Sequence, residues 1–204
     1  MDRDAWNQRY SSPDLVWTAT PNRTVAEQVA DLEPGRALDL ATGEGRNAIW
    51  LAEQGWRVTA VDFSDAGIAT GRRMAAERDV DVDWVVDDVT VHRPEPGAYD
   101  LVLIAYLHLP AAQRHSVMAA AREAVAPGGT FLLVGHDLSN IEHGHGGPQD
   151  PAVLCTPDDI AADLPGFDIE RAEVLERVVA LDPGHGGPSE AVALDTFVRA
   201  RRPA

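Results

Sequence analysis

The sequence contains no lysine and only one cysteine, and each scarcity excludes a class of chemistry. All 17 Lys+Arg residues are arginines, so the chain lacks a phosphate-binding GK[ST] loop, a Schiff-base lysine and a lysine general base. Cys155 alone can form neither an internal disulfide nor an all-cysteine metal site. None of the six serines lies in a G-x-S-x-G sequence, which argues against a serine esterase.

Positive charge and long apolar runs are also scarce. The 17 arginines are outnumbered by 33 acidic residues, which gives a formal net charge of −16. Such a surface repels a phosphate backbone, so we expect no nucleic-acid partner. The longest apolar run, 101–107, has seven residues, far below the ~18 of a membrane span. The first residues also lack a basic start followed by an apolar core. We therefore expect a cytoplasmic protein without a membrane partner.

Helical and strand-like segments alternate along the 204 residues, which predicts an α/β sheet in one domain. A stretch without periodicity, 135–156, is expected to be a long loop. The last two strands flank a Gly/Pro turn, and we expect them to form an antiparallel hairpin. The expected strands are 36–40, 57–61, 82–86, 100–105, 130–134, 168–180 and 191–200, and the expected helices are 24–32, 46–54, 64–77, 110–125 and 157–164.

A glycine-containing turn follows the first predicted strand and opens a helix. The strand ends at Asp39, and the segment ATGEGRN (41–47) follows it. Its glycines allow a ligand to approach the backbone, and the helix N-terminus offers free N–H groups to negative charge. Asp62 ends the second strand, where a carboxylate can accept hydrogen bonds from two ribose hydroxyls. This layout predicts a site for a cofactor that contains a nucleoside.

Two cofactor classes share this layout. Gly43, Gly45 and Ala48 match the dinucleotide fingerprint G-x-G-x-x-A, with Asp62 as the ribose acid, so a nicotinamide-dependent oxidoreductase is one alternative. Asp39, four residues before Gly43, argues against it. A second carboxylate beside a bound pyrophosphate would be repelled, whereas beside a sulfonium or ammonium group it would be favourable.

Five segments together carry a family resemblance over residues 36–135. They are LDLATGEGRN (38–47), AVDFS (60–64), DDV (87–89), YDLVL (99–103) and APGGTFLLV (126–134). With them the sequence resembles the class I S-adenosylmethionine-dependent methyltransferases. Within that class, the GEGRN loop and the WNQRY and PN segments near the start are most similar to small tellurite- and thiopurine-type methyltransferases.

The resemblance implies a fold and a cofactor. The fold is a Rossmann-like, doubly wound seven-stranded sheet, mostly parallel, with an antiparallel C-terminal hairpin. The cofactor is S-adenosyl-L-methionine, with S-adenosyl-L-homocysteine as its product. A single methyltransferase domain, 1–204, would then comprise a helical or lid segment (1–35), a cofactor-binding core (36–135), an acceptor loop (136–156) and a C-terminal helix and hairpin (157–204).

The resemblance also assigns individual cofactor contacts. Asp39 and the glycines would hold the methionine end, and Asp62 the ribose. Phe63 would cover one adenine face and Val89 the other. Asp88 would contact the adenine edge, with Asp87 as an alternative to Asp88. Ala41 departs from the usual first glycine, and Arg46 is either a carboxylate ligand or surface charge. The expected contacts are Trp17, Asp39, Ala41, Gly43, Gly45, Arg46, Asn47, Asp62, Phe63, Asp87, Asp88, Val89 and Ala105.

Histidines gather at the predicted carboxyl ends of the strands, where ligands of such sheets bind. His108 follows the fourth strand, His136 ends the fifth, and His143 and His145 follow in the loop. The pentapeptide GHGGP occurs at 144–148 and again at 184–188, so both copies could face the acceptor. A histidine base is typically worth ~10²–10⁴-fold in rate, and His145 is the first candidate. The histidine spacing supports no metal site, and we expect none.

We therefore expect a methyltransferase that acts on a hydroxyl of a small molecule, either a sugar or a phenol, with a histidine base. A monomer or a homodimer is expected. Three alternatives stay open: a thiol- or tellurite-type methyltransferase that needs no base, a nicotinamide-dependent oxidoreductase, and a non-catalytic module that binds the same cofactor.

Overall fold

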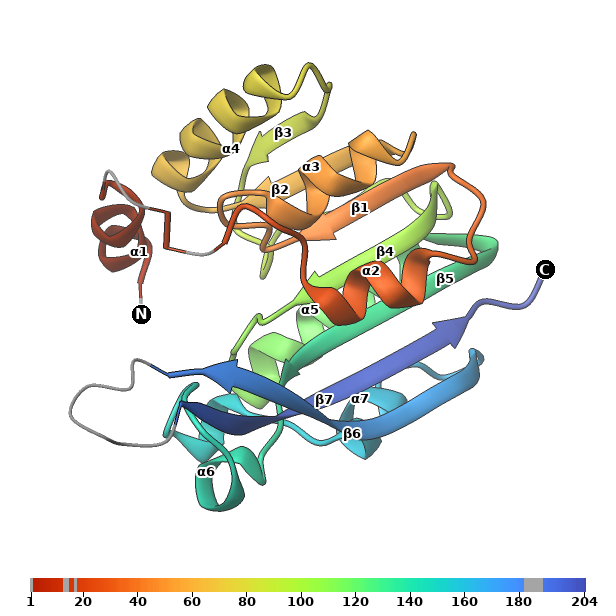
Figure 1. Ribbon diagram of the computed structural model, residues 1–204. Helices are drawn as coiled ribbons and strands as arrows, with labels where there is room; N and C mark the ends of the chain where they lie inside the picture. Colours follow the sequence, from red (N-terminus) through yellow and green to blue (C-terminus); the bar gives the residue numbers. More distant parts are fainter. Residues whose placement is uncertain (1, 13–14, 17, 182–188) are drawn as a thin grey trace.

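Seven strands form one sheet in the order β3-β2-β1-β4-β5-β7-β6 in the computed structural model (Figure 1). The structure describes residues 2–12, 15–16, 18–181 and 189–204; Trp17 and the second GHGGP segment, 184–188, lie outside the described residues. β1 to β5 are parallel, and β7 is antiparallel to β5 and β6. This confirms the predicted fold class. The strands are β1 (Arg36–Leu40), β2 (Arg57–Asp62), β3 (Asp83–Val86), β4 (Tyr99–Ala105), β5 (Val125–His136), β6 (Asp168–Ala180) and β7 (Glu190–Arg201).

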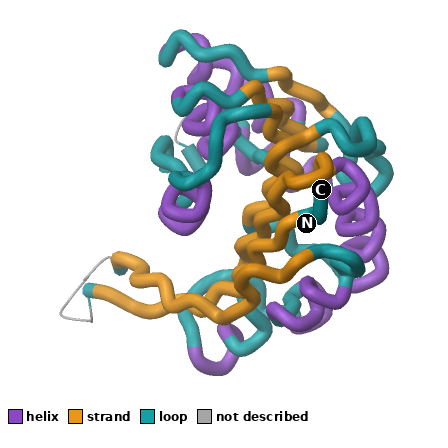
Figure 2. Tube along the Cα trace, turned by 90° about the vertical axis from the view of Figure 1, so that its right-hand side faces the viewer, coloured by secondary structure: helices purple, strands orange, loops and turns teal. Residues whose placement is uncertain are grey.

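Helices cover both faces of the sheet (Figure 2). Successive strand side chains point to opposite faces, so Ala37 and Leu101 pack with α2 and α3, whereas Leu38 and Val102 pack with α5 and α7. The central strands are buried on both sides, which accounts for their nearly continuous apolar sequences. The helices are α1 (Arg3–Tyr10), α2 (Arg23–Val29), α3 (Arg46–Glu53), α4 (Asp65–Glu77), α5 (Ala111–Ala124), α6 (Asn140–His143) and α7 (Pro157–Ala162), with a 3₁₀ helix at Pro151–Val153.

Two predicted segments differ from the structure. β5 begins at Val125 rather than Thr130. Val125 already pairs with Tyr99 of β4, and after a register shift at the Pro-Gly-Gly turn Thr130 pairs with Leu101. The predicted loop 135–156 contains the end of β5, α6 and the 3₁₀ helix. These helices have only four and three residues, too few to show an apolar period, so the sequence pattern did not indicate them.

The topology brings residues from distant parts of the sequence to one edge. The carboxyl ends of β1 to β5 meet there because these strands are parallel. β7 runs the other way, so its first half lies beside the end of β5, with Asp195 paired in register to both His136 and Leu175. The β6–β7 hairpin extends beyond the rest of the sheet at this edge (Figure 2).

Candidate active site

The loop between β1 and α3 has a backbone that favours glycine. Gly43 and Gly45 have φ angles of 59° and 78°, and Ala41 has a φ of 61°. A side chain at Gly45 would also collide with the Trp84 ring, 2.3 Å from the built Cβ. Ala41 thus occupies the left-handed region that usually requires glycine, at a cost of about 1–2 kcal/mol. Ala41 therefore keeps a glycine-like backbone conformation at the position where the family usually has its first glycine.

Asp39 is a buried carboxylate beneath this loop, with only 1% of its surface exposed. Its Oδ2 accepts a hydrogen bond from the Thr42 hydroxyl at 2.6 Å. Oδ1 has no hydrogen-bond partner among the described residues. Burial raises the pKa of Asp39 to about 7, and the nearby Ala48 N–H opposes the shift without forming a regular hydrogen bond. A cationic or hydroxyl donor bound beside Asp39 would satisfy this oxygen.

The start of α3 favours an anion, whereas Asp39 favours a cation or a hydroxyl donor. Gly45 is its N-cap and provides no side-chain cap, so the first N–H groups of the helix can attract an anion. Arg46 follows it, half-buried, and burial lowers the pKa of its guanidinium. One loop therefore presents a carboxylate for a cation and a helix end for an anion. The amino-acid end of a ligand carries both charges, because it has a free ammonium group and a free carboxylate group.

Asp62, at the end of β2, supports the same loop. Its two oxygens accept hydrogen bonds from the N–H groups of Gly43, at 2.8 Å, and Ser64, at 2.9 Å. Burial raises its pKa. A carboxylate has about four lone-pair sites, so Asp62 can also accept a hydrogen bond from a hydroxyl group. Its assignment to the ribose stays a prediction.

The residues predicted for the adenine lie at the neighbouring strand end. Val89 is buried and Phe63 is half-buried. Asp87 accepts a hydrogen bond from His92 at 2.7 Å, which lowers the pKa of Asp87. Asp88 is exposed and binds Thr90. The roles of these residues, and of Ala105 at the end of β4, remain predictions.

The N-terminal segment is attached to the β1–α3 loop region by polar contacts that sequence reasoning missed. Asn22 donates its backbone N–H to the Asn47 side chain at 2.9 Å. The Arg46 guanidinium donates to the Thr18 hydroxyl at 3.4 Å. At the other end of the segment, the Ser64 hydroxyl donates to Asn7 of α1 at 2.5 Å. The segment thus contacts both the α3 and the α4 ends of the loop region.

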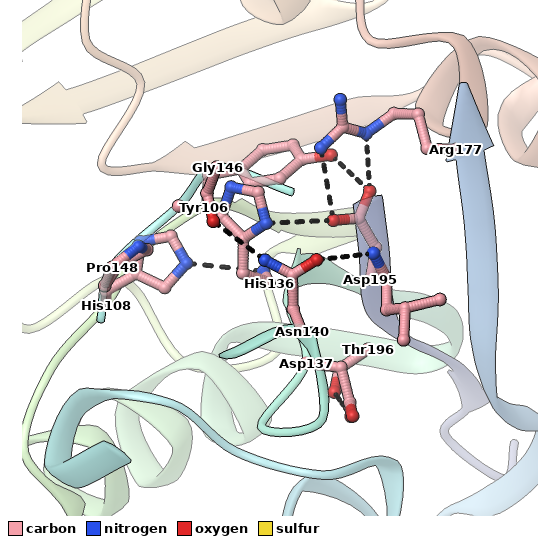
Figure 3. Close-up of polar contacts among 12 residues, drawn as sticks. Tyr106, His108, His136, Asp137, Asn140, Gly146, Pro148, Arg177, Asp195 and Thr196 are labelled. Carbon is pink, nitrogen blue, oxygen red and sulfur yellow. Dashed lines mark hydrogen bonds and ion pairs between the residues drawn. The ribbon is translucent and has the colours of Figure 1, made fainter. Parts of the chain in front are cut away.

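A second group of polar side chains lies where β4, β5, β6 and β7 meet (Figure 3). The Tyr106 hydroxyl donates to Asp195 at 2.7 Å, and Arg177 donates to the same carboxylate from Nε at 2.6 Å. His136 Nδ1 lies 3.4 Å from Asp195 Oδ1, and the His108 ring stacks on His136 with centroids 5.5 Å apart. We call these five residues the edge cluster.

Sequence reasoning found only the two histidines of the edge cluster. Tyr106, Arg177 and Asp195 were missed, although one signal was present: Asp195 is the only charged residue in the strand segment AVALDTFV (191–198). The cluster is close to the β1–α3 loop, because Asn22 contacts both Asn47, at 2.9 Å, and Tyr106, at 3.4 Å, and the charge of Arg177 acts on Arg46.

The four predicted base candidates occupy different environments. His108 and His136 are partly buried in the edge cluster, and burial lowers the pKa of both, that of His108 to about 4. His143 and His145 are exposed. The first GHGGP segment nevertheless reaches the cluster through its glycines, because a Cβ at Gly147 would lie 2.6 Å from the His136 ring. The catalytic role of each histidine stays a prediction.

Two further findings concern the described part of the chain. It holds no group of three or more His, Cys, Asp or Glu side chains placed to bind a metal ion. No helix there has both the length and the apolar character needed to cross a membrane.

Fold and site together define an α/β protein with a glycine-containing loop and buried carboxylates at the carboxyl edge of its sheet, the edge at which such folds bind their ligands. Residues 37–129 match the family described as "Methyltransferase domain". Together with the strand order, this match supports the class I S-adenosylmethionine-dependent methyltransferases as the class of this chain. The finding confirms the class predicted from the sequence and, with it, S-adenosylmethionine as the cofactor. It argues against the nicotinamide-dependent alternative. The likeness to tellurite-type enzymes stays a prediction.

Individual relatives agree with this class. The chain is 31% identical over 123 residues to demethylmenaquinone methyltransferase of Thermus thermophilus. The aligned segment covers 59% of this chain and 54% of the relative. It is 32% identical over 108 residues to ubiquinone biosynthesis O-methyltransferase of Cronobacter sakazakii, covering 52% and 44%. The chain thus matches about half the length of these curated relatives.

Solved structures show the same fold. A structure from a study described as "Conversion of a Disulfide Bond into a Thioacetal Group during Echinomycin Biosynthesis" superposes with a TM-score of 0.77. It covers 98% of this chain and 93% of the other, at 20% identity. A likeness at this identity concerns the fold alone.

Proposed function

We propose that this protein transfers a methyl group from S-adenosylmethionine to a hydroxyl group of a small molecule, with a phenolic hydroxyl as the favoured acceptor. The observation that carries the proposal is the position of the edge cluster. Two histidines with lowered pKa values lie beside a loop that fits the cofactor. The O-methyltransferase among the relatives supports an oxygen acceptor.

The residues of the loop fit S-adenosylmethionine. The unpartnered Asp39 oxygen can accept from the ammonium group, and the α3 N-terminus with Arg46 can bind the carboxylate. Asp62 has lone pairs left for the ribose hydroxyls. When bound, the cofactor supplies an electrophilic methyl group. The same loop fits a dinucleotide less well, because the Asp39 charge would repel a pyrophosphate.

The edge cluster supports base catalysis. A histidine that is neutral at physiological pH can take the hydroxyl proton, and such a base is typically worth ~10²–10⁴-fold. Positioning of the two reactants would supply most of the remaining acceleration, up to ~7–11 kcal/mol. A thiol acceptor would need little help from a base. It is the second candidate, because the GEGRN loop of this sequence resembles that of thiopurine-type methyltransferases.

A calorimetric titration followed by a transfer screen tests the proposal. We expect S-adenosylhomocysteine to bind and NADH not to bind. With methyl-labelled S-adenosylmethionine, label should pass to phenols or sugars and less to thiols and carboxylates. Tight binding of NADH would contradict the cofactor assignment. Transfer to thiols alone would contradict the oxygen acceptor, and binding without any transfer would indicate a non-catalytic module.

A further inference from the structure

Asp195 is a carboxylate buried within the sheet and surrounded by partners from three other strands. It is 1% exposed on β7. The Tyr106 hydroxyl reaches it from the end of β4, Arg177 from β6, and His136 from the end of β5 (Figure 3). Arg177 makes a second contact, from its terminal nitrogen to Oδ1 at 3.3 Å. Replacing a buried ion pair by apolar side chains is often neutral or stabilising, so stability alone does not account for this arrangement.

The His136 ring is held on several sides. The His108 ring stacks on it at an interplanar angle of 23°, and the Tyr106 ring meets it edge-on with centroids 5.2 Å apart. Gly147 closes a further side, because no Cβ would fit there beside the ring. Only 13% of the side chain is exposed. The ring therefore has little freedom to turn, and Nδ1 stays directed at Asp195.

The two nitrogens of His136 differ in their surroundings. Nδ1 is buried and lies 3.4 Å from Asp195, too poorly aligned to count as a hydrogen bond. Catalytic hydrogen bonds in ligand-free proteins are often long and tighten when the substrate binds. A proton on Nδ1 faces a negative charge, whereas a lone pair there would be repelled by it. This favours the tautomer in which Nδ1 carries the proton and Nε2 has the lone pair.

His108 is less suited to accept a proton. Its Nε2 already accepts a hydrogen bond from the backbone N–H of His136 at 3.3 Å. Its proton is therefore on Nδ1, and its available lone pair is occupied. Among the described residues, no hydrogen bond occupies Nε2 of His136, so of the two buried histidines only His136 has a free acceptor nitrogen.

We infer that Asp195 is a positioning residue, which holds His136 with its Nε2 lone pair available as the general base, while Arg177 and Tyr106 fix Asp195. This inference rests on the proposed function. In the step, the acceptor hydroxyl gives its proton to Nε2, and its electron pair forms the new O–CH₃ bond. The S–CH₃ bond breaks with its electrons staying on sulfur, which leaves S-adenosylhomocysteine. The imidazolium is stabilised by Asp195 and later loses its proton to water.

The charges around His136 are consistent with this role. The groups that face it are Tyr106 and His108 from the loop after β4, Arg177 from β6 and Asp195 from β7. The segment 144–148 approaches the ring through Gly147. Asp195 raises the pKa of His136, while burial, the largest effect, and Arg177 lower it. The imidazole is thus neutral before the step, and a neighbouring anion is in place for the charge that develops during it.

The first test is the tautomer of His136 in the wild-type protein with S-adenosylhomocysteine, measured by ¹⁵N NMR of the histidine rings. We expect protonated Nδ1 and unprotonated Nε2. In Asp195→Asn, the pKa of His136 should fall further, because an anion has been removed. Asp163→Asn is the matched control: Asp163 contacts the His115 ring at 2.6 Å, so its removal should change His115 and leave His136 unchanged. A wild-type His136 protonated on Nε2 overturns the inference, and so does an Asp195→Asn variant whose His136 does not change.

The second test separates positioning from structural support. Transfer to phenol is compared with transfer to 4-nitrophenol at mildly alkaline pH, where the second acceptor is already largely ionised. Asp195→Asn should lower transfer to phenol at least tenfold more than transfer to 4-nitrophenol, while S-adenosylhomocysteine affinity stays near that of the wild type. Equal losses with both phenols overturn the inference. If the wild-type protein transfers to no hydroxyl at all, the proposed function fails instead, and the tautomer measurement decides the role of Asp195 by itself.

Discussion

The hydroxyl of Tyr106 lies 2.7 Å from the Asp195 carboxylate, although 89 positions separate the two residues. Tyr106 follows β4 with a φ of 58°, a conformation that bulky residues seldom adopt. Such backbone strain persists only where the surroundings hold it, and it concentrates at functional sites. Here the Asp195 and Asn22 contacts hold the phenol in place. The strained residue therefore joins the N-terminal segment, β4 and β7 at the point where the β1–α3 loop and the edge cluster meet.

Replacing Asp62 by alanine tests the ribose assignment. Hydrogen bonds to a charged partner are worth about 1.5–3 kcal/mol each, so losing two from the ribose should weaken S-adenosylhomocysteine binding at least tenfold. Some loss of stability is also expected, because the Gly43 and Ser64 N–H groups lose their acceptor. Calorimetry on the folded variant measures the first effect and thermal unfolding the second. Asp83→Asn, an exposed change at the start of β3, is the control, and unchanged affinity in Asp62→Ala would rule out the assignment.

Asp39 should make both stability and cofactor affinity depend on pH. Its folded-state pKa is raised from 3.8 to about 7 by burial, so the folded protein holds this proton more tightly than the unfolded chain. Its ionisation therefore reduces stability as pH rises from the unfolded value towards about 7. Asp39→Asn should be more stable than the wild type above this range by about 1–3 kcal/mol. The difference should vanish below the unfolded value.

Cofactor affinity should respond in the opposite direction. A bound ammonium favours ionised Asp39, so wild-type affinity for S-adenosylmethionine should fall as pH is lowered through about 7. In Asp39→Asn the affinity should be weak and nearly constant across this range. Denaturant unfolding and calorimetry at a series of pH values measure both effects. A wild-type affinity that does not change with pH would show that Asp39 does not contact the cation.

The glycine-containing loop between β1 and α3 was predictable from the sequence, whereas most of the edge cluster was not. Gly43 and Gly45 follow β1, and Asp62 ends β2; the apolar sequences of these strands mark where they end, so local patterns located the three residues. Arg177 and Asp195 lie inside strands, and their meeting with Tyr106 depends on how β7 pairs with β5 and β6. No local pattern encodes that register. An isolated carboxylate in an apolar strand was the available signal, because such a group is seldom buried without a partner.

Comparing two histidine variants identifies the base. His136→Ala should lower transfer by about 10²–10⁴-fold, with S-adenosylhomocysteine affinity nearly unchanged. His145→Ala should transfer at close to the wild-type rate, because the His145 side chain is exposed. Initial rates at saturating cofactor measure the difference. The reverse result, a large loss in His145→Ala alone, would place the base in the loop after β5, as the sequence first suggested.

Two neighbouring glycines of the first GHGGP segment allow the packing of His136 to be tested against a matched control. Gly146 and Gly147 both have a φ of 73°. An alanine at either position therefore adopts the same unfavourable backbone conformation, at a cost of about 1–2 kcal/mol. Only the Cβ at Gly147 meets the His136 ring, at 2.6 Å, whereas nothing lies within 4 Å of a Cβ at Gly146.

Both variants should therefore lose stability through backbone strain, Gly147→Ala the more because its Cβ must also displace the His136 ring, and the two should differ in activity. In Gly147→Ala the His136 ring must move, and a small misplacement of a reacting group can lower a rate by ~10²-fold. Gly146→Ala should keep most of the wild-type rate, and both variants should bind S-adenosylhomocysteine like the wild type. Thermal unfolding, calorimetry and initial transfer rates measure these quantities. If the two variants lose activity to the same extent, backbone strain in the loop explains the loss, and contact between Gly147 and His136 has no part in transfer.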